Sequence, residues 1–193
     1  MALKKRTKNI IGIVAILSFL VLWTILIYNY PPSKIVEIIG IENGYAVSFF
    51  AALLGGTSVL FPLPYHLIVF TLGAGGLNPF FLGILAGTGV MLGDSTSYLL
   101  GYAGREVVPG RIVSIFNKLH LWAMKKPKWT MPLFLFAYGA FVPVPNDVVV
   151  IPLGIARYPY LKTVLPLTFG NIIFSIVIAF AGLYGWEWIV SLI

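Results

Sequence analysis

The sequence contains no cysteine and little charge. Without cysteine, disulfide bonds, thiolate metal ligands and thiol nucleophiles are excluded. Only 10% of the 193 residues are charged and 59% are hydrophobic, whereas soluble domains carry about 25% charged residues. A run of 51 residues (43–93) and another of 24 (163–186) hold no Asp, Glu, Lys or Arg. Because a spanning helix needs about 20 apolar residues, the composition predicts an all-α integral membrane protein.

The first apolar segment, residues 10–28, follows four basic residues within residues 1–8. It is longer than the apolar core of a secretory signal, which has about 7–15 residues. We expect a retained N-terminal transmembrane helix with its N-terminus in the cytoplasm. Pro31 and Pro32 end it, because proline cannot donate the next helical hydrogen bond. The chain then divides into this helix with its linker, residues 1–45, and a membrane domain, residues 46–193.

Paired prolines interrupt the two apolar stretches of the membrane domain. Pro62 and Pro64 break the first stretch, and Pro143 and Pro145 break the second. Two prolines one residue apart cannot sit inside a regular helix, so a break is expected at each pair. Further breaks are expected from Gly73 to Asn78 and, at the equivalent position of the second stretch, at Gly154. Between them, residues 79–104 carry closely spaced small residues, which is typical of a spanning helix packed against others.

A shift of 81 residues superimposes the two broken segments. It places Pro62 on Pro143, Pro64 on Pro145, Gly73 on Gly154, Gly89 on Gly170, Gly101 on Gly182 and Gly104 on Gly185. Such self-similarity indicates an internal repeat. We place repeat 1 at about residues 46–104, a basic connector at 105–128 and repeat 2 at about 129–193.

The basic residues favour one orientation for these repeats. Residues 105–128 hold six basic residues and one acidic residue, with apolar positions opposite Arg111 and Lys118. This pattern predicts a cytoplasmic amphipathic helix, lying either on the membrane surface or on the protein's own cytoplasmic face. If each broken stretch is a re-entrant hairpin, every basic segment falls on the cytoplasmic side. The excess of positive charge then reflects membrane topology, and nucleic-acid binding is not expected.

The same argument makes the two halves an inverted repeat, each a re-entrant hairpin followed by a transmembrane helix. The proline tips would meet near the bilayer midplane, where broken helices are tolerated only beside protein or a cavity. Broken helices in inverted repeats are typical of transporter binding sites. The protein is therefore expected in the cell membrane, as a multi-pass protein.

His66 and Asp147 occupy equivalent positions, two residues beyond Pro64 and Pro145 respectively. They are candidates for a proton-sensitive pair at the midplane. The alternative is that Asn146 or Asp147 simply caps the second half-helix, where the positive end of the helix dipole favours such side chains.

Asp94 lies inside the predicted spanning helix, with Tyr98 one turn away. A carboxylate within the membrane is a candidate proton carrier or ligand contact. The alternative is a structural residue whose oxygens are satisfied by neighbouring hydroxyls. Arg157 follows the second hairpin and is a candidate contact for lipid phosphate at the cytoplasmic mouth, although it could also serve topology alone.

Signals for catalysis are absent from the sequence. It has neither a His-Glu-x-x-His nor a Gly-x-Ser-x-Gly motif. Asp94 and Asp147 could form a dyad, but Asp94 follows Met91-Leu92-Gly93 and so lacks the Gly-x-Gly-Asp signature of intramembrane proteases. We expect no enzymatic activity, no metal site and no cofactor.

Residues 55–185 resemble the DedA family, also called the VTT or SNARE-associated membrane domain. The resemblance rests on Pro62-Leu63-Pro64 with Leu72-Gly73-Ala74 and Gly76-Leu77-Asn78-Pro79, on Gly93-Asp94 with Tyr98 and Gly101, and on Phe141-Val142-Pro143 with Leu153-Gly154-Ile155-Ala156-Arg157, Gly170 and Gly182. It implies inverted re-entrant hairpins and transport of membrane lipids. The chain differs from the family at His66, which is usually acidic there, and at Ala140 and Asn146, which usually are arginines.

The expected function is therefore transport of a lipid or lipid-phosphate carrier between leaflets. The resemblance implies membrane lipids as partners, polyprenyl phosphate or phospholipid among them, with protons as a coupling ion. Two alternatives stay open: a proton-coupled exporter of small solutes or drugs, and a membrane scaffold that docks partners through its basic helix. The sequence leaves open the substrate, the direction of transport and whether the chain forms a homo-oligomer.

Overall fold

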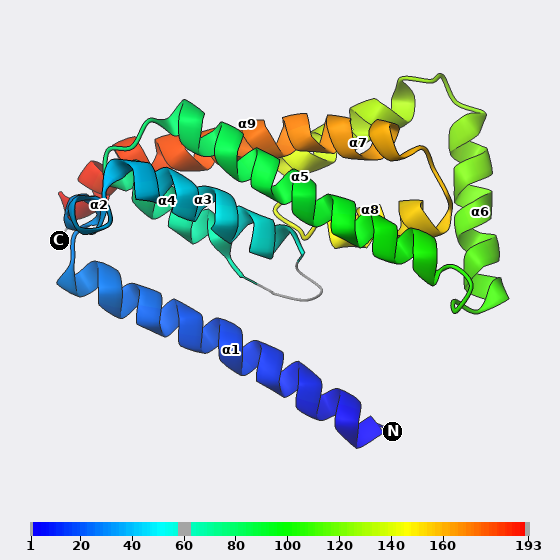
Figure 1. Cartoon of the computed structure of the whole chain (residues 1–193), viewed down its shortest axis with the longest axis horizontal. Coiled ribbons are helices and arrows are strands. Elements are labelled where there is room, and N and C mark those ends of the chain that lie inside the picture. The colour runs from blue at the N-terminus through cyan, green and yellow to red at the C-terminus, as the bar shows by residue number, and fades with distance from the viewer. Residues whose placement is uncertain (1, 58–62, 192–193) are drawn as a thin grey trace.

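All secondary structure in the computed structural model is helical, over the residues that it describes, 2–57 and 63–191. In chain order the helices are α1 (Ala2–Asn29), α2 (Pro32–Ile39), α3 (Ile41–Gly56), α4 (Tyr65–Ala74), α5 (Pro79–Gly104), α6 (Gly110–Met124), α7 (Thr130–Phe141), α8 (Asp147–Ile155) and α9 (Tyr160–Val190) (Figure 1). The predicted all-α class is confirmed.

The helix ends predicted from the prolines are found in the structure. α1 ends before Pro31, and α7 and α8 are separated at Pro143 and Pro145. In the first hairpin Pro64 stands immediately before α4, while Pro62 lies outside the described residues. The predicted helix over residues 79–104 coincides with α5, whose first turn is capped by the side chain of Asn78.

The breaks predicted at Gly73 and Gly154 are present, but they begin two residues further along the chain, because α4 ends at Ala74 and α8 ends at Ile155. Both glycines lie inside helices, one residue before the end of α4 and of α8. The chain reverses three residues later, at Gly76 and Arg157, which adopt positive φ angles of 91° and 56°. Gly73 and Gly154 instead serve close helix packing, because a β-carbon on either would collide with the backbone of a neighbouring helix.

Helix α2 was not predicted from the sequence, which indicated only a short polar linker. Pro32 starts it, because proline suits the first helical turn. One face buries Ile35 and Val36, and Lys34 and Glu37 form a 3.0 Å ion pair. At Gly40, with φ of 85°, the chain turns so that α2 and α3 meet at 101°.

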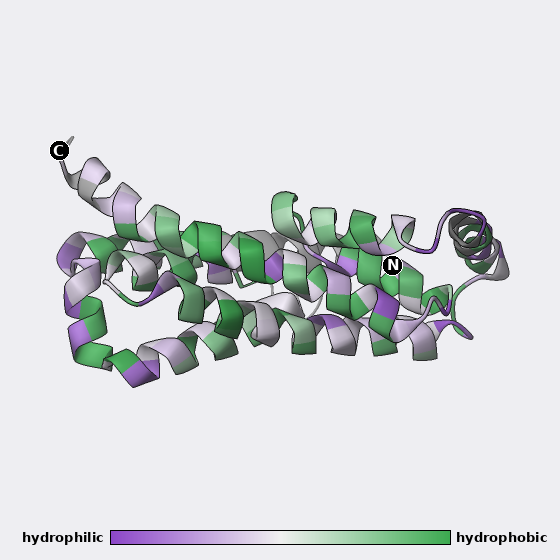
Figure 2. Ribbon diagram, turned by 90° about the horizontal axis from the view of Figure 1, so that it is seen from above, coloured by the Kyte–Doolittle hydropathy of each residue, from purple (hydrophilic) through white to green (hydrophobic). Residues whose placement is uncertain are grey.

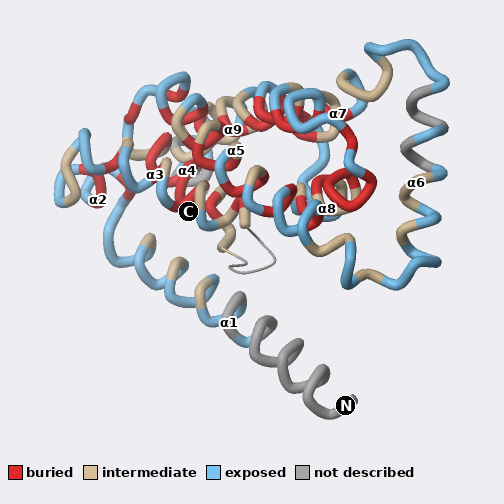
Figure 3. The backbone as a smooth tube through the Cα atoms, turned by 45° about the vertical axis from the view of Figure 1, so that its right-hand side comes forward, coloured by how far each residue is buried: buried red, intermediate tan, exposed pale blue. Residues whose placement is uncertain are grey.

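The two halves pack crosswise. Each hairpin's first helix contacts the long helix of its own half, α3 with α5 and α7 with α9. Each second helix contacts the long helix of the other half, α4 with α9 and α8 with α5. The long helices α5 and α9 also pack along one another at the centre (Figures 1 and 3).

Glycine contacts at these crossings are related by the 81-residue shift. Gly73 faces the carbonyl of Ala179, and Gly154 faces that of Tyr98. A second pair of contacts is related by the same shift: Gly101 faces the carbonyl of Ile151, and Gly182 faces the carbonyl of Phe70. A β-carbon at any of these four glycines would overlap the facing carbonyl oxygen, so the helices approach closely only because glycine stands there.

Among the described residues, the segment Tyr160–Trp186 of α9 is the one helix long and apolar enough to cross a membrane by itself. A second span results when the bent pair α2 and α3 is counted as one. Helix α5 is long, but Asp94 and its many glycines and hydroxyl residues lower its hydropathy. Hydrophobic residues occur along the whole length of the bundle (Figure 2).

Candidate functional site

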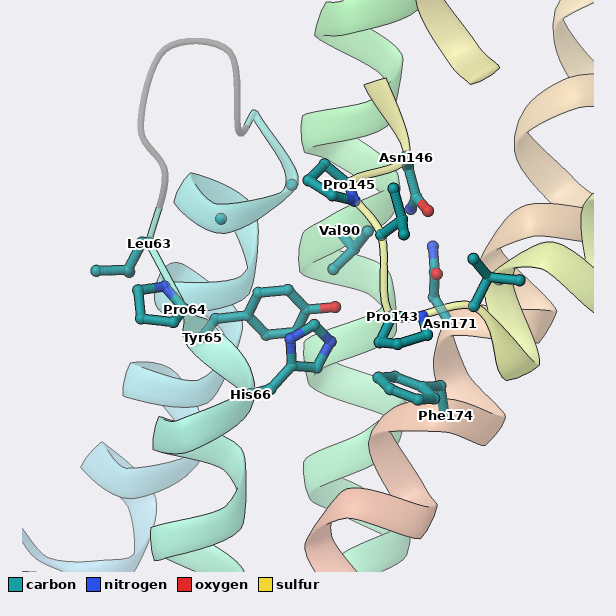
Figure 4. A pocket seen from close by; sticks show the side chains of 15 residues that line it. Leu63, Pro64, Tyr65, His66, Val90, Pro143, Pro145, Asn146, Asn171 and Phe174 are labelled. Carbon is teal, nitrogen blue, oxygen red and sulfur yellow. The ribbon is translucent and has the colours of Figure 1, made fainter. Parts of the chain in front are cut away.

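A cavity of about 310 Å³ lies between the two hairpin tips (Figure 4). The first tip contributes Leu63, Pro64, Tyr65 and His66; the second contributes Val142, Pro143, Val144, Pro145 and Asn146; and helices α3, α5, α7 and α9 contribute Gly55, Gly56, Val90, Gly139, Asn171 and Phe174. Two proline-broken segments about 80 residues apart in sequence thus line one cavity.

The wall formed by the first tip is aromatic. The rings of Tyr65 and His66 have centroids 3.9 Å apart, and the ring of Phe174 meets His66 edge-on at 5.0 Å. Tyr65 is buried, whereas His66 is partly exposed toward the cavity. Figure 4 shows both side chains directed from the start of α4 toward Pro143.

On the opposite wall, two amides bind a buried carboxylate. The Nδ2 atom of Asn146 donates to Oδ2 of Asp94 at 2.9 Å, and Nδ2 of Asn171 donates to the same oxygen at 3.3 Å. Asp94 is fully buried, whereas both asparagines line the cavity. Its other oxygen, Oδ1, has no hydrogen-bond partner among the described residues. The amides therefore separate the cavity from the carboxylate and hold it in place.

Asp147 is the first residue of α8 and is buried, close enough to Asp94 for their charges to interact. The cap predicted at Asn146 is wrong in part: Asn146 occupies the N-cap position, but its side chain makes no capping hydrogen bond. Its amide is bound to Asp94 instead. The predicted pairing of His66 with Asp147 stays a prediction.

Two further predicted site residues, Tyr98 and Arg157, do not line the cavity. The hydroxyl of Tyr98 donates to the carbonyl of Tyr158 at 2.5 Å and so fixes the turn between α8 and α9. Arg157 is exposed on that same turn, with its guanidinium 5.0 Å from the ring centre of Tyr102. Both residues belong to a region beyond the cavity, at the end of α5.

The sequence did not single out Tyr65, Asn171 or Phe174. A usable signal existed for Asn171, which interrupts a charge-free apolar run and is the 81-residue equivalent of Val90, another cavity residue. Tyr65 and Phe174 carried no such signal, because aromatic residues are frequent throughout this chain.

The carboxylate of Asp94 can take up a proton, and the cavity beside it can hold a cation or a polar group. The aromatic wall of the cavity suits an apolar portion of a ligand. Among the described residues no three His, Asp or Glu side chains gather as a metal site would require. In comparisons with known proteins, the chain matches no family model, no curated protein and no solved structure.

Proposed function

We propose that this chain is a multi-pass membrane transporter of the DedA type, which moves a lipid or a lipid-phosphate carrier between the leaflets of the cell membrane. The observation that carries the proposal is the shared cavity, lined by both proline tips and backed by the buried carboxylate of Asp94. Broken helices that meet around a polar site are the usual architecture of secondary transporters.

Exposed apolar side chains support a membrane environment. The outer faces of α5 and α9 present Phe80, Phe81, Leu99, Phe169, Val177 and Tyr184, each 57–67% exposed. Large apolar side chains exposed to this degree on both long helices would be unfavourable in water, because apolar surface gains free energy when it is removed from water. In a bilayer the same faces contact lipid tails, so the proposal accounts for them without any further partner.

The crossed packing supports an inverted repeat. Helices α3, α4 and α5 correspond to α7, α8 and α9 in order and in contacts, and the glycine contacts recur at the 81-residue shift. Such a repeat places the two hairpin tips on opposite sides of the cavity. Small movements of one half against the other would then open the cavity to alternate faces of the membrane.

Lipid exchange between leaflets tests the proposal. Purified protein is reconstituted into liposomes, and flipping of labelled polyprenyl phosphate and of a labelled phospholipid is measured with and without a pH gradient. We expect exchange above protein-free vesicles, strongly reduced in Asp94→Asn and Asp147→Asn, because each variant removes a buried carboxylate behind the wall that Asn146 and Asn171 form. Thr96→Ala is the matched control on α5: Thr96 is exposed and bonds only its own helix, through the carbonyl of Gly93.

Wild-type protein that is folded yet moves neither lipid would contradict lipid transport. The aromatic wall of Tyr65, His66 and Phe174 favours a proton-coupled exporter as the second candidate. Uptake of a fluorescent aromatic cation into the same liposomes, driven by a pH gradient, distinguishes that function. Activity in neither assay would favour a membrane scaffold.

A further inference from the structure

A second hollow, a crevice of about 590 Å³, lies where the end of α5 meets α6 and the turn between α8 and α9. In Figure 1, α6 runs across the ends of α5 and α8 at this place. The crevice is lined by Arg105, Glu106, Val108, Gly110, Val113, Ser114, Asn117 and Arg157. None of these residues lines the hairpin cavity, so the crevice is a separate site.

Arg105 is fixed in this crevice by two hydrogen bonds. Its Nη1 donates to the carbonyl of Ile155 in α8, and its Nη2 donates to Oδ1 of Asn117 in α6 at 3.2 Å. The guanidinium thus joins three helices. Because a guanidinium carries five N–H donors, these two bonds leave others for a ligand.

Arg157 stands where the first repeat has a glycine. Both turns have the same hydrogen bonds: Gly76 N–H to Gly73 and Leu77 N–H to Leu72, then Arg157 N–H to Gly154 and Tyr158 N–H to Leu153. Position 76 has φ of 91° and position 157 has φ of 56°. Glycine is the favoured residue at such a helix end, because an L side chain is strained there. An arginine is therefore held in an unfavourable backbone conformation, which is typical of functional positions.

The Arg157 guanidinium is also available. Its guanidinium carbon lies 5.0 Å from the ring centre of Tyr102, and this cation–π contact uses none of its N–H donors in a hydrogen bond to the described residues. No carboxylate oxygen of the described residues lies within 4.0 Å of it, although Glu106 lines the same crevice.

We propose that this crevice binds a phosphate group, through the guanidinium groups of Arg105 and Arg157 with the Ser114 hydroxyl and the Asn117 amide beside them. A phosphate matches two guanidinium groups because its several oxygens each accept charge-assisted hydrogen bonds. Two arginines against Glu106 leave a net positive lining. In the proposed membrane orientation the crevice opens at the cytoplasmic surface, so a lipid headgroup or free phosphate could supply the group.

Binding to detergent-purified protein tests the proposal, and it does not depend on transport. Microscale thermophoresis would compare inorganic phosphate, dioctanoyl phosphatidic acid and, as the uncharged counterpart, dioctanoylglycerol. We expect the phosphatidic acid to bind and dioctanoylglycerol not to bind. Binding of inorganic phosphate too would identify the phosphate group alone as the ligand, whereas binding of phosphatidic acid only would identify a lipid headgroup.

Arg157→Gly is the informative variant, because glycine relieves the strained φ angle while removing the guanidinium. We expect its melting temperature to be no lower than that of the wild type and its affinity for phosphate to fall about tenfold or more, the effect of losing charge-assisted hydrogen bonds. Lys118→Ala is the control, because Lys118 is exposed on α6 and lies outside the crevice lining. This variant should bind phosphatidic acid with the affinity of the wild type. The proposal is overturned if the wild type binds neither phosphate ligand, if Arg157→Gly binds unchanged, or if that variant unfolds.

Discussion

At the scale of single residues, glycine sets how closely the helices approach. The missing β-carbons of Gly73, Gly101, Gly154 and Gly182 leave room for carbonyl oxygens of the facing helices. Within a bilayer, where helices are not driven together by water, such close contacts are a main source of association. Replacement of glycine by alanine should therefore lower stability where the glycine packs against a facing helix and raise it where the added carbon meets no neighbour.

Gly154→Ala tests this at a packed position. Its methyl group would collide with the backbone of Tyr98, so we expect a loss of about 1–3 kcal/mol of stability from overpacking. Gly185→Ala in α9 is the control, because beyond the adjacent residues and the backbone of its own helix nothing lies within 4 Å of the added carbon. Alanine there should stabilise the helix by about 0.5–1 kcal/mol. Thermal unfolding in detergent measures both, and equal effects would contradict this account of the packing.

At the scale of elements, the hairpins differ in chemistry although they share a packing pattern. The first tip presents aromatic side chains, Tyr65 and His66, whereas the second presents prolines, valines and Asn146. Only the second tip supplies an amide to Asp94. A ligand in the cavity would therefore meet a different surface on each side.

Chemical crosslinking tests whether the tips face one another. In this cysteine-free chain we expect His66→Cys and Val144→Cys, both lining the cavity, to be joined by a short bifunctional maleimide. His66→Cys with Thr96→Cys is the control, since Thr96 is exposed and outside the cavity lining. Single variants labelled in full, with no bridge in the first pair, would rule out a shared cavity.

At the scale of the whole molecule, the bundle has two unlike ends. Helix α2 and the last turns of α9 lie at one end of the long axis, and the basic helix α6 lies at the other (Figure 1). Lysine and arginine near spanning helices remain on the cytoplasmic side. The proposed orientation therefore puts α6 in the cytoplasm and α2 outside.

Accessibility of introduced cysteines to a membrane-impermeant maleimide tests this orientation. In intact cells we expect Lys34→Cys of α2 to be labelled and Lys118→Cys of α6 to be protected, since both side chains are exposed on the protein. Permeabilised cells should label both. Labelling of Lys118→Cys before permeabilisation would reverse or refute the orientation.

How far the sequence predicted the structure varies with the feature. The helix ends at Pro31, Pro64, Pro143 and Pro145 could be predicted, because the effect of a proline on helix hydrogen bonding is local. Helix α2 was missed because eight residues with three buried side chains give little periodic signal. Asn171 was missed because its role depends on Asp94, 77 residues away in the chain. The helix ends near Gly73 and Gly154 were expected two residues too early, because the sequence does not distinguish a glycine that permits close helix packing from one that ends a helix.

The crossed packing has a consequence for biosynthesis. Helix α4 is completed early by the ribosome, but the helix that covers it, α9, is made more than 80 residues later. Until then the contact face of Phe70 and Gly73 has no protein neighbour of its own. On the proposed membrane topology, the first hairpin would remain beside lipid or the insertion machinery until α9 is made, and the two halves would assemble late and together.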